Sequence, residues 1–434
     1  MRARLILMLK FPRPGAVKTR LIPALGAERA CALHRALVAA TLATIREFSA
    51  TTAVAVEVRI TGSPDDQAAR AWLGEGVAIR EQGEGDLGAR MERAIAAAFA
   101  EGMEQVVVIG GDCPEIRPHH LAAAFGALTE REAVLGPAAD GGYYLIGLRR
   151  PLSALFRGIA WGGAEVRAQT LAAAQTHGVS LAALEQLRDI DIPEDLPVWA
   201  ATPAARASGQ GGVSVVIPAL NEEETLPVTL AAVRAGGPFE IIVVDGGSRD
   251  RTLAVARAHE AIGLSAEGGR ASQLNAGAAA AVGEFLLFLH ADTLPPPGYA
   301  DIVRATLARP GVAAGAFAFA ITGEFSGRRL IEAGANWRAR RLGLPYGDQG
   351  LFLRRDAFEG LGGFPVQSIM EDYAMVRRLK SRGDIVVTPE AALTSGRRWR
   401  ERGAIQTMAI NQLVLAGYAL GVAPARLARW YRGE

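Results

Sequence analysis

Two aspartates in this chain each follow an apolar run and precede proline, and both have the chemistry of a metal and phosphate site. Asp112 lies in VVVIGGDCPE and Asp292 lies in FLLFLHADTLPPP. A carboxylate at the carboxyl end of a strand in an open α/β sheet lies where such sheets bind ligands, and it suits a divalent cation that carries a diphosphate. The sequence therefore predicts two nucleotide-handling sites, one in each half of the chain.

A basic loop in the first half could bind phosphates. KFPRPGAVKTRL follows the first apolar run and places Lys10, Arg13, Lys18 and Arg20 around a Pro-Gly turn. Close cations stabilise the charge that develops on a triphosphate, and a solvated basic loop is the alternative. The loop is not a P-loop, because Val17 stands where a glycine should precede the lysine.

Further acids in the first half could complete its site. Asp189 and Asp191 in DIDIPEDL could join Asp112 on one magnesium ion, because that ion usually needs only one or two protein carboxylates. GEGDLG at residues 83–88 has the letters of a dinucleotide fingerprint, but its acids would face a pyrophosphate. Asp86 there is expected either to cap the next helix or to touch a base or ribose.

The second half carries its own candidates for nucleotide and metal binding. EIIVVDGGS ends a predicted strand on Asp245, which could hold a uracil or ribose edge, and Arg270 further on could reach a diphosphate. His290 and Asp292 are two residues apart, so on an extended strand both side chains would face the same side. His290 is expected to bind a metal or a ribose, with a structural histidine as the alternative.

Acidic and cationic side chains near the C-terminus suit group transfer. Glu371 and Asp372 begin a predicted helix, where acids are commonly dipole partners. A sugar transfer also needs a carboxylate that takes the proton of the acceptor hydroxyl, and Asp372 is favoured for that role. Arg397, Arg398 and Trp399 form a cationic and aromatic cluster that could stabilise a departing diphosphate or line an acceptor site.

Alternating strands and helices must position these residues. Apolar strands alternate with Ala-rich helical stretches, and that alternation predicts a mainly parallel sheet in each half. The helical stretches include residues 28–48, 87–100 and 226–234. A stretch rich in Ala, Pro, Ser and Gly without periodicity predicts a linker at 201–212, between domains at 1–200 and 213–434. Each domain is long enough to bury a core.

Composition excludes several classes. A net charge of +2, from 47 basic and 45 acidic residues, argues against nucleic acid as the main partner. Two cysteines give no disulfide framework, which favours the cytoplasm. The first apolar run has five residues and is too short for a secretory signal. Residues 405–422 fall short of a membrane span and predict a core or dimer helix, with an interfacial membrane helix as the alternative.

The first half resembles a known transferase family. KxPxPGxVKTRL, GDLGxRM, GGDCP, DGGYYLIGL and DIDxPEDL together resemble the radical-SAM/selenodomain-associated transferases of the first type, relatives of the phospholactate and molybdenum-cofactor guanylyltransferases. The resemblance covers residues 1 to about 200 and implies a GT-A-like fold and nucleotidyl transfer from a nucleoside triphosphate.

That resemblance also assigns roles to residues of the first half. Asp112 and one of Asp189 and Asp191 become metal ligands, and Lys18 and Arg20 act on the reacting phosphates. Nucleotide contacts are expected from Lys10, Asp86, Arg90 and Asp140, which lie in or beside the matching motifs.

The second half resembles another transferase family. PALNEEE, VVDGGSRDRT, GRASQLNAGA, FLHADT, GDQGLFLRR, MEDYxMxRRL and RRW resemble the second-type radical-SAM/selenodomain-associated transferases, within the family-two glycosyltransferases, over about 213–431. The resemblance implies a GT-A fold, a nucleotide-sugar donor, Mg²⁺ or Mn²⁺ and an inverting displacement, with Asn221 and Glu222 at the donor. His290 replaces the first aspartate of the usual motif and Ser395 replaces a glutamine of processive members, so single-sugar transfer is expected.

These features predict a bifunctional cytoplasmic enzyme built from two tandem GT-A-like α/β domains. Its expected partners are a nucleoside triphosphate, a nucleotide-sugar and a small-molecule acceptor, in arsenosugar-type synthesis by resemblance, and a homodimer is a further expectation. One alternative is a membrane-surface glycosyltransferase with a polyprenyl phosphate acceptor and an inert N-terminal nucleotide-binding module. A dinucleotide-dependent oxidoreductase is the least favoured alternative.

Overall fold

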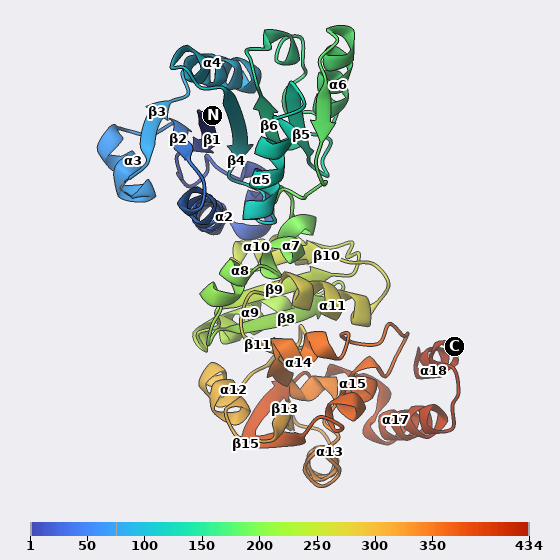
Figure 1. The fold of residues 1–434 in the computed structure, drawn as a ribbon. Helices are drawn as coiled ribbons and strands as arrows, with labels where there is room; N and C mark the ends of the chain where they lie inside the picture. The colour runs from blue at the N-terminus through green and yellow to red at the C-terminus, as the bar shows by residue number, and fades with distance from the viewer. Residues whose placement is uncertain (1, 75, 433–434) are drawn as a thin grey trace. The chain divides into compact units, whose positions relative to one another are not determined.

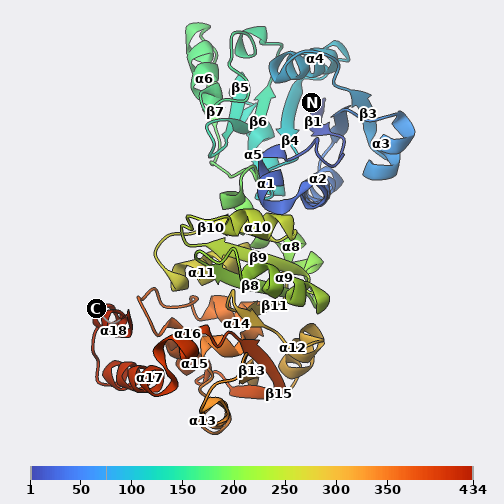
Figure 2. The same cartoon turned by 180° about the vertical axis from the view of Figure 1, so that it is seen from behind.

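The chain forms two compact units. The computed structural model describes residues 2–74 and 76–432. Unit 1 contains residues 1–22 and 27–204, and unit 2 contains residues 23–26 and 205–434. In each unit a mainly parallel sheet is flanked by helices (Figures 1 and 2), which confirms the predicted fold class.

Unit 1 is built on a seven-stranded sheet in the order β3-β2-β1-β4-β6-β5-β7. The strands are β1 (Ala3–Lys10), β2 (Val54–Thr61), β3 (Ala78–Glu81), β4 (Gln105–Gly110), β5 (Ala133–Pro137), β6 (Tyr143–Leu148) and β7 (Leu181–Ala183). β6 runs antiparallel to both neighbours, and the other pairs are parallel. The carboxyl ends of β1 and β4 therefore lie at one edge of the sheet.

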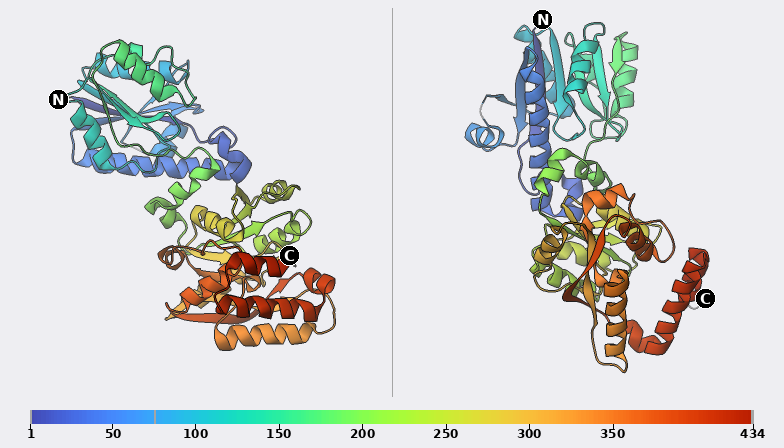
Figure 3. Two further views of the ribbon diagram at one scale, coloured as in Figure 1. Left: turned by 90° about the vertical axis from the view of Figure 1, so that its right-hand side faces the viewer. Right: turned by 60° about the horizontal axis from the view of Figure 1, so that its bottom comes forward.

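Helices cover both faces of this sheet (Figure 3), and strand alternation explains why. Leu5 and Leu7 of β1 pack toward α2 and α5, whereas Ile6 packs toward α4 and α6. The helices are α2 (Ala27–Ala50), α3 (Asp66–Leu73), α4 (Leu87–Ala100), α5 (Pro118–Ala127), α6 (Val166–Thr176) and α7 (Leu196–Ala200), with 3-10 turns η1 (Thr19–Leu21), η2 (Ser153–Leu155) and η3 (Pro193–Asp195). Helix α1 (Ile22–Leu25) falls mostly in the short segment that belongs to unit 2.

Unit 2 is built on an eight-stranded sheet in the order β10-β9-β8-β11-β14-β13-β15-β12. The strands are β8 (Val213–Ala219), β9 (Glu240–Asp245), β10 (Ile262–Ser265), β11 (Phe285–Phe288), β12 (Thr293–Leu294), β13 (Val312–Ile321), β14 (Leu351–Arg354) and β15 (Asp384–Thr394). β14 is antiparallel to β11 and β13, as β6 is to its neighbours in unit 1. Apart from β12, the two sheets share one strand order.

The helices of unit 2 include one of the predicted helical stretches, residues 226–234. They are α8 (Pro203–Ser208), which begins just before the unit, α9 (Leu226–Ala235), α10 (Thr252–Ala258), α11 (Arg270–Ala280), α12 (Tyr299–Leu307), α13 (Arg328–Leu342), η4 (Gly347–Gln349), α14 (Arg355–Gly360), α15 (Glu371–Leu379), α16 (Arg397–Arg402), α17 (Ala404–Ala419) and α18 (Pro424–Arg432). The predicted stretches 28–48, 87–100 and 226–234 are α2, α4 and α9, and the predicted linker contains α8. Within the described ranges, no helix has the length and apolar character that a membrane crossing needs.

Candidate functional site

In unit 1, Lys18 lies between two carboxylates at the carboxyl edge of the sheet. Its Nζ is 3.0 Å from Oδ1 of Asp112 and 3.0 Å from Oδ1 of Asp191. Only 4% of the Lys18 side chain is exposed, and its backbone is left-handed with φ 48°. Burial lowers the pKa of Lys18, but attraction by Asp112 and Asp191 outweighs this and raises the pKa overall. The ammonium group therefore stays charged.

Asp189 is the most desolvated acid of this site. Its Oδ1 is buried and has no hydrogen-bond partner among the residues that the structure describes. Burial, followed by the charges of Asp112 and Asp191, raises the pKa of Asp189 to about 7. The backbone N–H of Ile190 donates to the carbonyl of Asp112 at 3.0 Å, which ties the two acidic segments together. A buried carboxylate oxygen without a partner beside two other acids fits a cation ligand.

His34 also belongs to this site, and no motif marks it within its Ala-rich helix. Its Nε2 contacts the carbonyl of Lys10 at 2.9 Å, and its Nδ1 lies 3.8 Å from Oδ1 of Asp112. Burial is the main cause that lowers the pKa of His34. A neutral ring that donates to Lys10 therefore presents a lone pair toward Asp112.

The other predicted residues of unit 1 lie in more local contacts. Asp86 caps α4, because its Oδ1 accepts from the backbone N–H of Ala89 at 2.9 Å. Arg90 donates from Nε to the carbonyl of Gly85 at 2.8 Å. Oδ1 of Asp140 accepts from the N–H of Gly142 at 2.8 Å. Lys10 and Arg20 are exposed.

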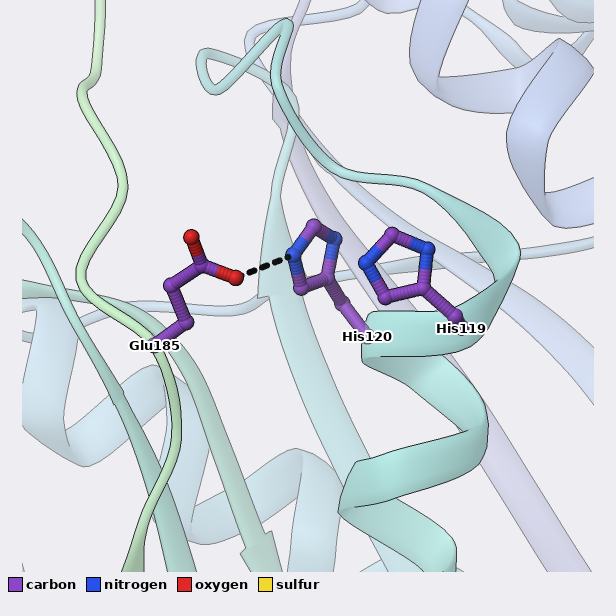
Figure 4. A group of neighbouring side chains, drawn as sticks. All are labelled: His119, His120 and Glu185. Atoms are coloured by element: carbon purple, nitrogen blue, oxygen red, sulfur yellow. Dashed lines mark hydrogen bonds and ion pairs between the residues drawn. The ribbon is translucent and has the colours of Figure 1, made fainter.

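A separate group of residues with metal-ligand chemistry, His119, His120 and Glu185, lies in unit 1 (Figure 4). His120 Nε2 lies 3.4 Å from Oε2 of Glu185, as Figure 4 shows. The backbone N–H of Arg117 donates to His120 Nδ1 at 3.0 Å, so a neutral ring carries its proton on Nε2. That nitrogen then donates to Glu185 and offers no lone pair to a metal. We assign the group to capping of α5.

Unit 2 holds a cavity of about 670 Å³ at the carboxyl edge of its sheet. Among the described residues, acids, one imidazole, two arginines and aromatic rings line the cavity. Among its lining residues are Glu222, Arg270, His290, Asp292, Tyr346, Asp348, Glu371, Asp372, Ser395, Arg397 and Trp399. Most of the candidates predicted in this half therefore meet in one space. The side chain of Arg398 falls outside the described part of the chain.

The acid pair at the start of α15 has two distinct environments. Oδ2 of Asp372 accepts from the backbone N–H of Gly347 at 2.7 Å. Glu371 is buried and lies 3.6 Å from Nη1 of Arg270. Burial and the charge of Asp372 raise the pKa of Glu371, while Arg270 lowers it. Met370 precedes the pair with φ 70°, a conformation that non-glycine residues rarely adopt and that often accompanies functional sites.

Asp348 is an acid of this cavity that the sequence reasoning missed. Its Oδ1 is buried without a hydrogen-bond partner in the described ranges. Burial raises the pKa of Asp348 to about 6, with Arg338 acting against the shift and Asp372 adding to it. The signal that could have found Asp348 is its place between glycines in GDQG.

The absence of a side chain at Gly347 leaves room for His290 and Asp372. A Cβ atom on Gly347 would lie 3.0 Å from Nε2 of His290 and 3.2 Å from Oδ2 of Asp372. Both contacts are tighter than ordinary van der Waals contact. A side chain at this position would therefore push against both cavity residues.

The predicted geometry of His290 and Asp292 is wrong in one respect. Strand β11 ends at Phe288, so the two residues lie in the following turn and strand alternation does not apply to them. Both side chains still line the cavity. The turn, not the strand, therefore brings them together.

Hydrogen bonds within and between the loops after β8 and β9 involve Asp245 and Asn221, which were predicted to bind the nucleotide-sugar. Asp245 is buried and accepts from the N–H of Gly247 at 3.1 Å and that of Ser248 at 3.0 Å. Asn221 is left-handed with φ 55°, and its Oδ1 accepts from the N–H of Arg249 at 2.9 Å. Asp245 and Asn221 therefore shape the loops beside the cavity.

Helix α17 also contributes to the cavity, which the sequence reasoning did not predict. Thr407, Asn411 and Val414 line it. Their spacing places them on one face of the helix. The C-terminal helices are therefore part of the site in unit 2.

Comparison with known families agrees with this division of the chain. Residues 44–163 match the family model described as "Uncharacterized protein conserved in bacteria (DUF2064)". Residues 214–362 match the family model Glycosyl transferase family 2. The second match lies within unit 2.

Individual relatives match parts of the chain. Undecaprenyl-phosphate 4-deoxy-4-formamido-L-arabinose transferase of Pectobacterium atrosepticum is 46% identical over 98 residues, 20% of this chain, and the chain spans 30% of that relative. A nucleotide-diphospho-sugar transferase structure from Desulfovibrio desulfuricans is 32% identical over 46% of this chain and 87% of that chain, with a TM-score of 0.44. A mannosyltransferase of Pyrobaculum calidifontis, in complex with GDP-mannose and Mn²⁺, is 18% identical over 56% of this chain and 80% of that chain, with a TM-score of 0.37.

Proposed function

We propose that unit 2 transfers a sugar from a nucleotide-sugar to an acceptor, with inversion at the anomeric carbon. The observation that carries this proposal is the cavity in which Arg270, His290, Asp292 and Asp372 meet, within a unit that matches family 2 glycosyltransferases. The acceptor oxygen forms a bond to the anomeric carbon while the bond to the nucleoside diphosphate breaks. A proton on that oxygen passes to Asp372.

The cavity supplies a group for each part of this reaction. His290, Asp292 and Asp348 are the residues that would hold a divalent ion, and the partnerless oxygen of Asp348 fits such a ligand. The ion would neutralise the donor diphosphate. Arg270, positioned by Glu371, adds positive charge at the leaving group.

Asp372 is the proposed base. Its Oδ2 is held by the N–H of Gly347, which fixes the carboxylate in the cavity. A positioned base contributes about 10²- to 10⁴-fold to the rate. Arg397 and Trp399 line the same cavity and are assigned to the acceptor or departing diphosphate.

The test of unit 2 is an Asp372→Asn variant of the full chain. Nucleoside diphosphate release from a panel of nucleotide-sugars with Mn²⁺ should slow by about 10²-fold or more, while donor affinity changes little. Asp301→Asn is the matched control, because the Asp301 side chain is 86% exposed on α12. Near-normal turnover of Asp372→Asn would remove it from the mechanism.

For unit 1 we propose nucleotidyl transfer from a nucleoside triphosphate, with pyrophosphate as the leaving group. Asp112, Asp189 and Asp191 would hold a divalent ion, and Lys18, which contacts Asp112 and Asp191, would bind the phosphates of the triphosphate. The arsenosugar-type pathway implied by resemblance would make the two reactions consecutive steps. Pyrophosphate release that is the same in the wild type and in Asp112→Ala would favour the alternative, an inert nucleotide-binding module.

A further inference from the structure

We infer that helices α13 and α17 form a docking face for an anionic lipid surface, and that the acceptor of unit 2 is carried by a lipid. The inference rests on the proposed glycosyl transfer for its statement about the acceptor. The docking face itself rests on exposed apolar and cationic side chains of these two helices. We call these side chains the α13–α17 face.

Helix α13 exposes two large apolar side chains. Leu330 is 72% exposed and Trp337 is 60% exposed. They are seven positions apart, which is about two helical turns, so they share one face. Tryptophan beside arginine is the side-chain combination that helices use at the boundary between headgroups and acyl chains.

The charge of α13 is strongly positive. Its sequence RRLIEAGANWRARRL holds five arginines and one glutamate. The glutamate, Glu332, is already engaged by Arg328 at 3.1 Å and by the N–H of Ile321 at 2.8 Å. Arg340 and Arg341 are exposed and form no ion pair within the described ranges. These cations remain available for anionic headgroups.

Helix α17 has an outward face of the same kind. The helix contains no charged residue over its length, although it lies at the surface. Met408 is 41% exposed, Leu413 is 54% exposed, and Leu420 at its C-terminal end is 84% exposed. Arg426 follows the uncharged segment. Helix α17 therefore exposes apolar side chains on a segment that carries no charge.

The two helices lie at the same end of unit 2 (Figures 1, 2 and 3). Both are also continuous with the proposed active site. Thr407 and Asn411 on the inner face of α17 line the cavity, and so does Trp399. Trp399 packs in one cluster with Ile331 of α13. An acceptor whose polar head enters the cavity could therefore keep its hydrocarbon chain in the lipid.

The positive charge of the α13–α17 face favours an anionic lipid surface as its partner. An apolar stripe bordered by unpaired arginines complements a layer of phosphate headgroups over acyl chains. The acceptor class that fits is a lipid with a phosphate or hydroxyl head. A second copy of this chain would instead place the arginines of one face against those of the other.

The test is co-sedimentation of the full chain with vesicles of phosphatidylglycerol and phosphatidylcholine in equal parts. The wild type should pellet with these vesicles and remain in solution with phosphatidylcholine alone. The double variant L330E/W337E should bind at least about tenfold more weakly, because two anchors become anions on a face that meets anionic lipid. Added salt should weaken wild-type binding.

Val228→Glu is the matched control, because Val228 is 61% exposed on α9 of the same unit. It should pellet like the wild type, and thermal melting should show that all variants fold. Failure of the wild type to pellet, equal binding to neutral vesicles, or equal loss in Val228→Glu would overturn the docking face. A dimer in sedimentation velocity without lipid that L330E/W337E abolishes would overturn it in favour of self-association.

Calorimetric binding of a nucleoside diphosphate with Mn²⁺ separates this inference from the proposed function. Binding should be the same in the wild type and in L330E/W337E. Loss of vesicle binding with intact nucleotide binding would overturn the docking face alone. Absence of nucleotide binding in the wild type would contradict the proposed donor site instead.

Discussion

The two units share a strand order, apart from β12, but the acid that follows the fourth strand has different surroundings in each unit. In unit 1, Asp112 follows β4 and contacts the buried ammonium of Lys18 at 3.0 Å. In unit 2, Asp292 follows β11 and lines a cavity of about 670 Å³. The sheet therefore sets where the acid lies, and the surrounding loops decide which ligand it meets.

The loop after the first strand of each sheet shows this most directly. After β1 the loop is cationic and delivers Lys18, whereas after β8 it carries Asn221 and the acidic Glu222. Unit 2 takes its positive charge from Arg270 instead, at the start of α11. This difference agrees with the triphosphate proposed for unit 1 and the nucleotide-sugar proposed for unit 2.

Lys18 is expected to give the largest effect that is confined to one unit. Lys18→Met should reduce pyrophosphate release by about 10²-fold or more, because a buried cation beside the phosphates is lost. Nucleoside diphosphate release by unit 2 should be unchanged. Arg131→Met, at an exposed position of unit 1, serves as the control. A Lys18→Met variant with wild-type pyrophosphate release would contradict the role of this loop.

Gly347 provides the corresponding test in unit 2. Gly347→Ala should slow glycosyl transfer by about tenfold or more, because its Cβ would press on His290 and Asp372. Gly360→Ala is the control, since a Cβ atom there meets nothing within 4 Å. Steady-state rates of nucleoside diphosphate release measure the effect. Equal rates for both variants would show that the close approach is unimportant.

Asp189 predicts a pH dependence of unit 1. Its pKa is raised to about 7, so the folded state holds a proton that the unfolded state, with an ordinary carboxyl pKa, releases. The stability from this group is therefore present at low pH and is lost as pH rises from about 4 to 7. The melting temperature of unit 1 should therefore fall as pH rises, and in Asp189→Asn this fall should be smaller by a few degrees.

The control for Asp189 is the exposed Asp66→Asn in the same unit, which should follow the wild type. Melting curves of unit 1 in the full chain between pH 5 and pH 8 make the measurement. A steeper fall in Asp189→Asn than in the wild type would contradict the assigned environment.

The smallest expected effect concerns Asp86. Asp86→Ala should destabilise unit 1 by about 1 kcal/mol through loss of the α4 cap, with pyrophosphate release unchanged. Urea denaturation measures the loss, and Asp65→Ala, which removes the cap of α3, provides a comparison of the same kind. A large fall in nucleotide affinity would instead show that Asp86 touches the nucleotide.

Local sequence patterns predicted much of the fold and the acids at the sheet edges. Alternation of apolar strands and Ala-rich helices is encoded over short windows, so α2, α4 and α9 were predictable. Asp112 and Asp372 were found because each stands at an element boundary. Local pattern was misleading for His290 and Asp292, because the strand ends before them.

Residues that enter a site through tertiary contacts were not predictable. His34 has no local motif that marks it, and only the packing of distant segments brings it to Asp112. Asp348 lies in GDQG, but its burial beside Asp372 also depends on the packing of distant segments. The exposed face of α13 is also invisible in sequence, because exposure depends on which side of a helix its neighbours cover. Such residues need the assembled fold.

A paired assay of the two leaving groups tests the central claim that each unit uses its own sheet-edge acid for its own reaction. The full chain would receive nucleoside triphosphates and nucleotide-sugars with Mg²⁺ or Mn²⁺. Asp112→Ala should lose pyrophosphate release by about 10²-fold or more and keep nucleoside diphosphate release, and Asp292→Ala should do the reverse. Loss of both products in one variant, or of neither product in both variants, would contradict the account.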